Sequence, residues 1–242
     1  MILTYIHNIS TAETLIKSAS QLAVQLGKNF AVYHVGSQEI LPDILPESAQ
    51  VIEPSSENLS EICEKNDISF LFIQLTVNNG KTIRKMLNDC RELRIPYVFF
   101  KDDFQPLQMS KVLVPVNFLE EELEKAQFAS AFGRFCQSEI HVLQANDYGS
   151  KAAANVQRMK ELFDKFEFQV VIEKAKKDSF AVEKEAVERA PDENAGIIIV
   201  SASRDYGLDD IIFGSKEYHL IRKSSVPLLL VNPRGDLYAL CD

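Results

Sequence analysis

The residues best placed to do chemistry lie near the end of the sequence, where Gly214 and Ser215 open a predicted helix. An apolar run at 197–200 and a polar loop precede them, and a second apolar run, 227–231, follows the helix. The free amides of a helix N-terminus and the helix dipole attract anions, and a serine at this position can cap the helix. This order of strand, loop and helix predicts a phosphate-type site. The alternative is a plain helix cap with water on its amides.

Other catalytic patterns are absent from the sequence. It has no Gly-x-Ser-x-Gly turn, no His-Glu-x-x-His motif and no cysteine–histidine pair at a recognisable spacing. His7 and His34 fall at predicted strand ends without a third ligand, so we predict no metal site. The carboxylates of 120–124 stand at a predicted helix start, where they stabilise the helix dipole. We therefore predict no catalytic residues and a protein that is not an enzyme.

Composition restricts the partners and the compartment. The 242 residues carry 26 Lys and Arg against 35 Asp and Glu, a formal charge of −9, which argues against a nucleic-acid or anionic-membrane surface. No apolar run approaches the roughly 18 residues of a membrane span. The first ten residues have no basic residue ahead of the apolar ones, and the four cysteines have no paired spacing. We expect a cytoplasmic protein with reduced cysteines.

An internal repeat organises the chain. The run Ile2–His7 resembles Val112–Asn117, and the same offset aligns Tyr33 with Leu143 without a gap. Later segments also correspond: 68–73 resembles 195–200, and 95–100 resembles 226–231. The offset grows between these segments, so the first half is an abridged copy. The missing residues fall where a crossover helix and the phosphate-type loop would be.

Short apolar runs alternate with helical patterns in both halves. In the first half we predict a helix over 11–26 with Ser10 as its cap, and in the second half helices over 120–135 and 215–223. Near-continuous apolar strands between helices indicate a parallel sheet covered on both faces. We therefore predict an α/β fold: two doubly wound, open parallel-sheet domains in tandem, 1–104 and 109–242, joined by the polar segment 101–108.

Taken together, these segments resemble the universal stress protein family in its tandem form, within the adenine-nucleotide α-hydrolase-like group. The resemblance rests on the strand opening Lys111–Val116, on Gly214-Ser215 and on the closing run Val226–Asn232. It covers nearly the whole chain and is stronger in the second half. It implies a five-stranded parallel sheet, dimerisation through the final strand and, in one branch of the family, ATP binding.

The ATP-binding branch has an Asp after its first strand and a loop of the form Gly-x2-Gly-x9-Gly-Ser/Thr. Carried over, the Asp position holds Asn117, the three glycines fall on Ser201, Arg204 and Gly214, and the hydroxyl falls on Ser215. The spacing is intact, but the carboxylate and two glycines are replaced. Arg204 either pairs with a phosphate or removes the close backbone approach that a glycine allows.

The first half has no such loop. Its strand-end position is His7, and its shortened loop ends in Gly80-Lys81-Thr82. The first glycine of a P-loop would fall on Leu75, so that motif fails and we expect no phosphate site there.

Three functions stay open at this point. The leading one is a cytoplasmic, non-catalytic stress-response or regulatory protein that binds ATP, AMP or another adenine nucleotide weakly through Asn117, Ser201, Arg204, Gly214 and Ser215. The second is a tandem scaffold that binds no nucleotide. The third, an ATP-dependent hydrolase or ligase, would need a catalytic constellation that the sequence lacks. As partners we expect a homodimer, or a pseudo-dimer of the two domains, with neither nucleic acid nor membrane.

Overall fold

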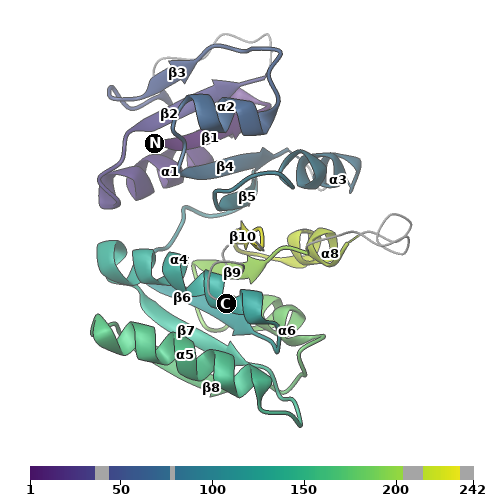
Figure 1. The fold of residues 1–242 in the computed structure, drawn as a ribbon. Coiled ribbons are helices and arrows are strands. Elements are labelled where there is room, and N and C mark those ends of the chain that lie inside the picture. Colours follow the sequence, from purple (N-terminus) through teal and green to yellow (C-terminus); the bar gives the residue numbers. More distant parts are fainter. Residues whose placement is uncertain (36–43, 77–79, 204–214, 235–242) are drawn as a thin grey trace. The chain divides into compact units, whose positions relative to one another are not determined.

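The computed structural model describes residues 1–35, 44–76, 80–203 and 215–234. The chain divides into two compact units, Met1–Leu107 and Gln108–Asp242, and each is described by itself (Figure 1). The domain limits 1–104 and 109–242 remain a proposal.

The N-terminal unit is built on a parallel sheet with the strand order β3-β2-β1-β4-β5. The strands are β1 (Ile2–Ile6), β2 (Phe30–His34), β3 (Gln50–Ile52), β4 (Phe70–Leu75) and β5 (Tyr97–Lys101). All side chains of β2 and β4 are buried, which explains why these segments read as near-continuous apolar runs. The edge strand β3 is short and mostly exposed.

The helices of this unit are the 3₁₀ turn η1 (Ile9–Thr11), α1 (Glu13–Gln25), α2 (Leu59–Lys65) and α3 (Gly80–Asp89). The chain runs from β1 to β2 in one direction along the sheet and from β3 to β4 and β5 in the other. Right-handed crossovers therefore place α1 on one face and α2 and α3 on the opposite face.

The predicted cap of the first helix is wrong. Helix α1 begins at Glu13, and Ala12 before it makes no side-chain cap bond. The side chain of Asn8 instead caps η1, accepting a hydrogen bond from the Ser10 amide at 3.0 Å. The extra 3₁₀ turn moves the helix start two residues beyond the prediction.

The C-terminal unit repeats this arrangement, with the strand order β10-β9-β6-β7-β8, again parallel. Its strands are β6 (Lys111–Val116), β7 (Glu139–Gln144), β8 (Val170–Lys174), β9 (Ile197–Ser201) and β10 (Leu228–Val231). The predicted fold class, α/β with parallel doubly wound sheets, is confirmed. The bounds predicted for β6 agree with the structure residue by residue.

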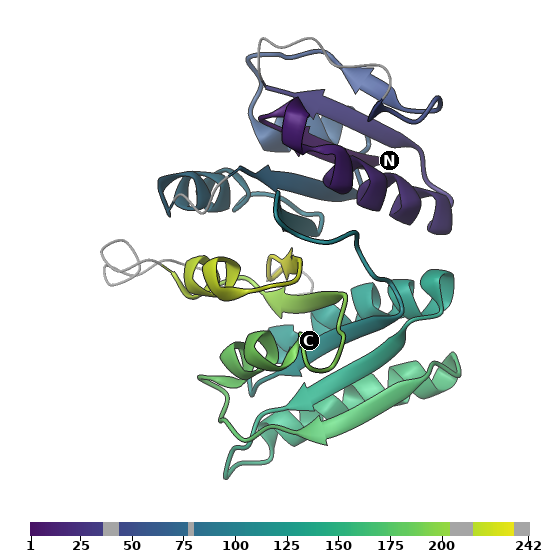
Figure 2. The ribbon, with the colours of Figure 1, turned by 180° about the vertical axis from the view of Figure 1, so that it is seen from behind.

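The helical segments of this unit are η3 (Glu120–Glu124), α4 (Lys125–Ala131), a π-helical turn η4 (Phe132–Cys136), α5 (Lys151–Lys165), α6 (Val182–Arg189) and α8 (Lys216–Lys223). The single helix expected over 120–135 thus consists of three consecutive segments of different pitch. Helices α4 and α5 cover one face of the sheet and α6 and α8 the other, as the front and back views show (Figures 1 and 2).

A common turn leads from helix to strand in both units. The residues Gly27, Asp67, Gln137, Glu167 and Asn194, each ahead of a strand, adopt left-handed conformations with φ between 50° and 60°. Only the first of the five is a glycine, the residue that adopts this conformation at least cost. The recurrence of one turn geometry in both units matches the internal repeat.

Candidate functional site

Three of the five predicted site residues lie among the described residues of the C-terminal unit. Asn117 directly follows β6, Ser201 ends the neighbouring strand β9, and Ser215 is the N-cap of α8. All three are at least 94% buried. Arg204 and Gly214 lie outside the described residues. The fold therefore puts Asn117 and Ser201 at the carboxyl ends of paired strands, where α/β sheets bind ligands.

Ser215 acts as a helix cap. Its Oγ accepts a hydrogen bond from the Tyr218 amide at 3.3 Å, and its backbone is extended, as a capping residue requires. Helix α8 begins with two charged residues, Lys216 and Glu217, and Glu217 is fully buried. The helix N-terminus predicted to attract an anion thus carries a carboxylate of its own.

Asn117 is held in a tight turn by three hydrogen bonds. Its Oδ1 accepts from the Leu119 amide at 2.7 Å, and its carbonyl accepts from Asn155 Nδ2 at 3.0 Å. Its own amide donates to Glu122 Oε2 at 2.9 Å. Among the described residues only the Nδ2 group of its side chain lacks a partner. The backbone amide that follows the first strand is therefore engaged by a carboxylate from within the unit.

Glu122 belongs to a buried ion pair that the sequence analysis missed. Its Oε2 lies 2.6 Å from Lys125 Nζ, and both side chains are fully buried. Lys125 also donates a hydrogen bond to the carbonyl of Pro115 in β6. The assignment of all carboxylates of 120–124 to helix-dipole stabilisation is wrong for Glu122, because the η3 turn directs it into the protein. The spacing of Glu and Lys three residues apart could have indicated this pair.

A second charged group joins β9 to helices α6 and α8. Lys216 Nζ donates to the carbonyl of Ser201 and to Glu183 Oε1, each at 3.0 Å. Glu217 Oε1 accepts from both the amide and the hydroxyl of Ser203, at 2.6 and 2.7 Å. These three charged residues were also absent from the predicted site, although Lys216 and Glu217 directly follow the predicted cap.

Some polar atoms at these strand ends remain unpaired. Within the described segments, Ser201 Oγ, Glu122 Oε1 and Glu217 Oε2 are buried without a hydrogen-bond partner. Two of the three are carboxylate oxygens, which cannot donate to a phosphate. Ser201 is the one predicted ligand whose hydroxyl is buried at this edge and free to bond a polar group.

Burial and charge act together on the Glu183–Lys216 pair. Desolvation raises the pKa of Glu183, and the nearby Lys216 opposes this shift. Burial alone would lower the pKa of Lys216, but Glu183 and Glu217 outweigh it, so the net shift is upward. Counting Glu122 and Lys125, the described charges here are three carboxylates and two ammonium groups. Such a site gives little electrostatic attraction to a polyphosphate.

In the N-terminal unit, an amide side chain accepts the hydrogen bonds of the backbone amides that follow the first strand. Gln74 Oε1 in β4 accepts hydrogen bonds from the amides of His7 and Asn8, both at 2.9 Å. Its Nε2 donates to the Asn8 carbonyl and to Asp102 Oδ1, at 2.9 and 2.8 Å. In both units, therefore, a side chain of the same unit accepts the hydrogen bond of the first backbone amide after the first strand.

The two strand-end histidines are packed but only partly bonded. His34 is 3% exposed, and within the described residues the Nε2 atoms of His7 and His34 have no partner. No group of three or more metal-ligating side chains is found among the residues described.

Within the described part of the chain, no helix has the length and apolar character needed to cross a membrane.

Comparisons with solved structures identify the fold. A universal stress protein from Archaeoglobus fulgidus DSM 4304 matches with a TM-score of 0.68 at 15% identity, over 97% of both chains. A functionally unknown protein from Pseudomonas aeruginosa PAO1 matches with a TM-score of 0.61 at 13% identity, over 99% of this chain and 94% of that one. No protein-family model and no curated protein sequence matches. Along nearly its whole length, the chain has the fold of a universal stress protein.

Proposed function

We propose that this chain is a non-catalytic regulatory protein of the universal-stress-protein type, which acts in the cytoplasm by association and binds no nucleotide at its C-terminal site. One observation carries the proposal. The amides of Asn117 and Ser203, at the ends of the two central strands, already donate to the carboxylates of Glu122 and Glu217. A phosphate would have to displace a buried carboxylate from hydrogen bonds of 2.6 to 2.9 Å.

The charges at the site support this reading. Glu122 is paired with Lys125 and Glu183 with Lys216, so the buried ammonium group of Lys125 and the partly exposed one of Lys216 are both already paired. An ammonium group that binds phosphate must be free to do so without leaving a carboxylate buried and unpaired. Substituting Asn for Asp and non-glycine residues for two loop glycines removes further contacts that a nucleotide would use.

The test is nucleotide content and affinity of the purified full chain. We expect mass spectrometry of the denatured protein to find no stoichiometric ATP, ADP or AMP, and calorimetric titration with millimolar ATP to give no binding heat. Copurified nucleotide at one equivalent, or saturable ATP binding, would overturn the nucleotide-free proposal. Light scattering coupled to size exclusion tests the association that we propose, with a homodimer as the expected state.

Weak adenine-nucleotide binding is the second candidate, and Ser215 favours it. The capped start of α8 and the free Ser201 hydroxyl are features that a phosphate or ribose could use. Arg204→Ala separates the two roles of that arginine: ATP affinity falls if Arg204 holds a phosphate, and stays or rises if it obstructs. ATP turnover sensitive to Asn117→Ala or Ser215→Ala would contradict the non-catalytic assignment.

A further inference from the structure

We propose that the N-terminal unit binds a small organic cation of the linear diamine or polyamine class in a cavity between helices α2 and α3. This inference concerns the other unit and does not depend on the function proposed above. The proposal follows from a cavity with an aromatic floor, from unpaired carboxylates on its walls, and from the replacement of both floor tyrosines in the second copy of the fold.

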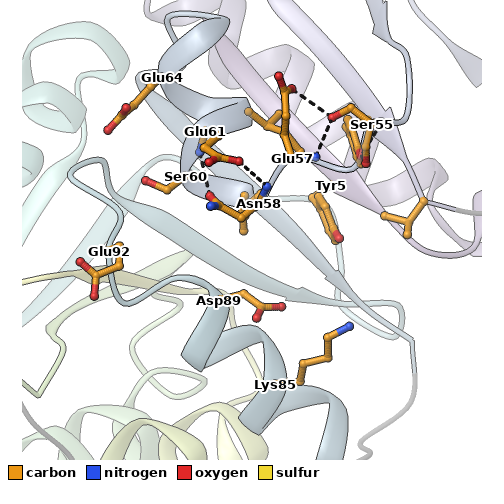
Figure 3. A pocket seen from close by; sticks show the side chains of 14 residues that line it. Tyr5, Ser55, Glu57, Asn58, Ser60, Glu61, Glu64, Lys85, Asp89 and Glu92 are labelled. Atoms are coloured by element: carbon orange, nitrogen blue, oxygen red, sulfur yellow. Dashed lines mark hydrogen bonds between the residues drawn. The ribbon is translucent and has the colours of Figure 1, made fainter.

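The cavity has a volume of about 650 Å³ and is lined by residues of β1, β2, α2 and α3, which all belong to the N-terminal unit. This volume lies within the range of small-molecule sites, about 300–1,000 Å³. Figure 3 shows the side chains of Ser60, Glu61 and Glu64 on one helix across from Lys85 and Asp89 on the other. The cavity thus has two helical walls and a floor formed by the sheet.

Two tyrosines form the floor. The rings of Tyr5 in β1 and Tyr33 in β2 are stacked, with centroids 5.5 Å apart and planes 6° from parallel. Tyr33 is fixed because its hydroxyl accepts a hydrogen bond from the Ser55 amide at 3.1 Å. The hydroxyl of Tyr5 has no partner among the described residues. Aromatic rings attract organic cations and pack against their methylene groups.

Ionisation of Tyr5 would not change this floor under ordinary conditions. Burial first, and then the neighbouring groups Tyr33 and Asp89, raise the pKa of Tyr5 to about 12. The phenol therefore stays neutral, so the floor adds no charge to that of the walls.

The walls are negatively charged. The lining contains five carboxylates and one ammonium group, that of Lys85. The carboxylates of Glu57 and Glu61 are engaged, with Lys65 and with the Asn58 amide. Three others, on both sides of the cavity, have no ion-pair or hydrogen-bond partner in the described part of the chain: Glu64, Asp89 and Glu92.

This distribution of charge selects the ligand class. A polyphosphate or carboxylate ligand would be repelled, whereas a cation would relieve the repulsion among the wall carboxylates. Because free carboxylates stand on both walls, a ligand with an ammonium group at each end pairs with both. Its methylene chain would then lie over the tyrosine rings.

The described residues of the second copy differ at the corresponding positions. There the equivalent helices α6 and α8 are joined directly by the Glu183–Lys216 ion pair at 3.0 Å. The internal repeat places Pro115 and Leu143 where the N-terminal unit has Tyr5 and Tyr33. The tyrosine floor is therefore specific to the N-terminal unit.

Calorimetry on the full chain tests the proposal with three probes: 1,4-diaminobutane, spermidine and 1,4-butanediol. The diol has the same carbon chain as the diamine but no charge. We expect one saturable site for both amines, tighter for spermidine and weakened by salt, and no binding of the diol. Absence of saturable amine binding, or equal binding of the diol, would overturn the proposal.

Matched variants locate the site. Asp89→Asn and Glu64→Gln should each weaken spermidine binding roughly threefold to tenfold, and Tyr5→Leu should weaken it where Tyr5→Phe does not. Glu13→Gln is the control, because this exposed carboxylate begins α1 on the opposite face of the sheet. If Glu13→Gln weakens binding as much as Asp89→Asn does, the interaction is a general attraction to an acidic protein and the cavity is not the site.

Discussion

The amide and the hydroxyl of Ser203 both donate to the same oxygen of Glu217, at 2.6 and 2.7 Å. Glu217 is the second residue of α8 and is fully buried. A carboxylate from the first turn of α8 therefore accepts the hydrogen bonds of two donors at the carboxyl end of the sheet in the C-terminal unit. These donors are already engaged within the unit, which supports the nucleotide-free function proposed above.

Removing this charge should open the site to anions. Glu217→Gln keeps the size of the side chain and one acceptor for Ser203, but removes the negative charge next to the helix start. We expect ATP affinity, measured by calorimetry, to rise roughly tenfold or more above the wild-type level. Asp192→Asn removes an exposed carboxylate of the same unit and should change nothing. If both variants behave like the wild type, charge is not what excludes the nucleotide.

The buried pair Glu122–Lys125 should show strong coupling. Lys125→Met leaves the Glu122 carboxylate buried without its counter-ion, and should lower the free energy of unfolding by about 3–5 kcal/mol. Adding Glu122→Gln should restore part of this loss, because no charge then remains buried while the Asn117 amide keeps an acceptor. Urea denaturation monitored by circular dichroism measures both effects.

The control for this pair is Lys160→Met. Lys160 pairs with Asp164 on α5, with both side chains about half exposed, so its loss should change stability by less than about 1 kcal/mol. A double variant as unstable as Lys125→Met alone would show that the carboxylate charge is not the source of the cost.

The N-terminal unit should lose stability in mild acid through His7. Burial, followed by the nearby Lys85 and His34, lowers the pKa of His7 below its usual 6.5. The unfolded chain therefore takes up this proton first as the pH falls. Stability is full above the unfolded pKa and declines from about pH 6.5 toward the folded pKa, by at most about 1.4 kcal/mol per pH unit.

The measurement compares wild type with His7→Phe, which keeps an aromatic ring at the edge contact with Tyr5. Urea denaturation at pH 8 and pH 5.5 should show a smaller loss in the variant, and an NMR titration should give the histidine pKa directly. An equal loss in both proteins would contradict the role of His7.

Gly196 should tolerate no side chain. A Cβ at this position would lie 1.5 Å from the carbonyl oxygen of Gln108, so the backbone would have to move. We expect Gly196→Ala to cost about 1–3 kcal/mol, measured as a lower thermal midpoint. Gly149→Ala is the matched control, since a Cβ there meets nothing within 4 Å. Similar midpoints for the two variants would show that the segment around Gln108 shifts freely.

The sequence alone determined the fold class, because it depends on local patterns. Apolar runs long enough for buried strands, helical periodicity between them and an internal repeat permit few arrangements other than tandem parallel sheets. The strand at 111–116 and the cap at Ser215 are local features of this kind. The start of α1 was missed because the intervening 3₁₀ turn competes with the helix for the same residues.

Tertiary structure decided what the site contains. In the sequence, nothing distinguishes Glu122, Glu183 and Glu217 from ordinary surface carboxylates. Only the packing of the folded chain directs their side chains inward. Their partners come from other elements: Glu217 bonds Ser203, and Glu183 bonds Lys216 thirty-three residues away. The Tyr5–Tyr33 stack likewise exists only because parallel pairing sets the two residues side by side. The pattern of a sequence shows which residue types alternate or repeat. The direction of a charged side chain depends on elements far away in the sequence, which come to lie beside it only when the chain folds.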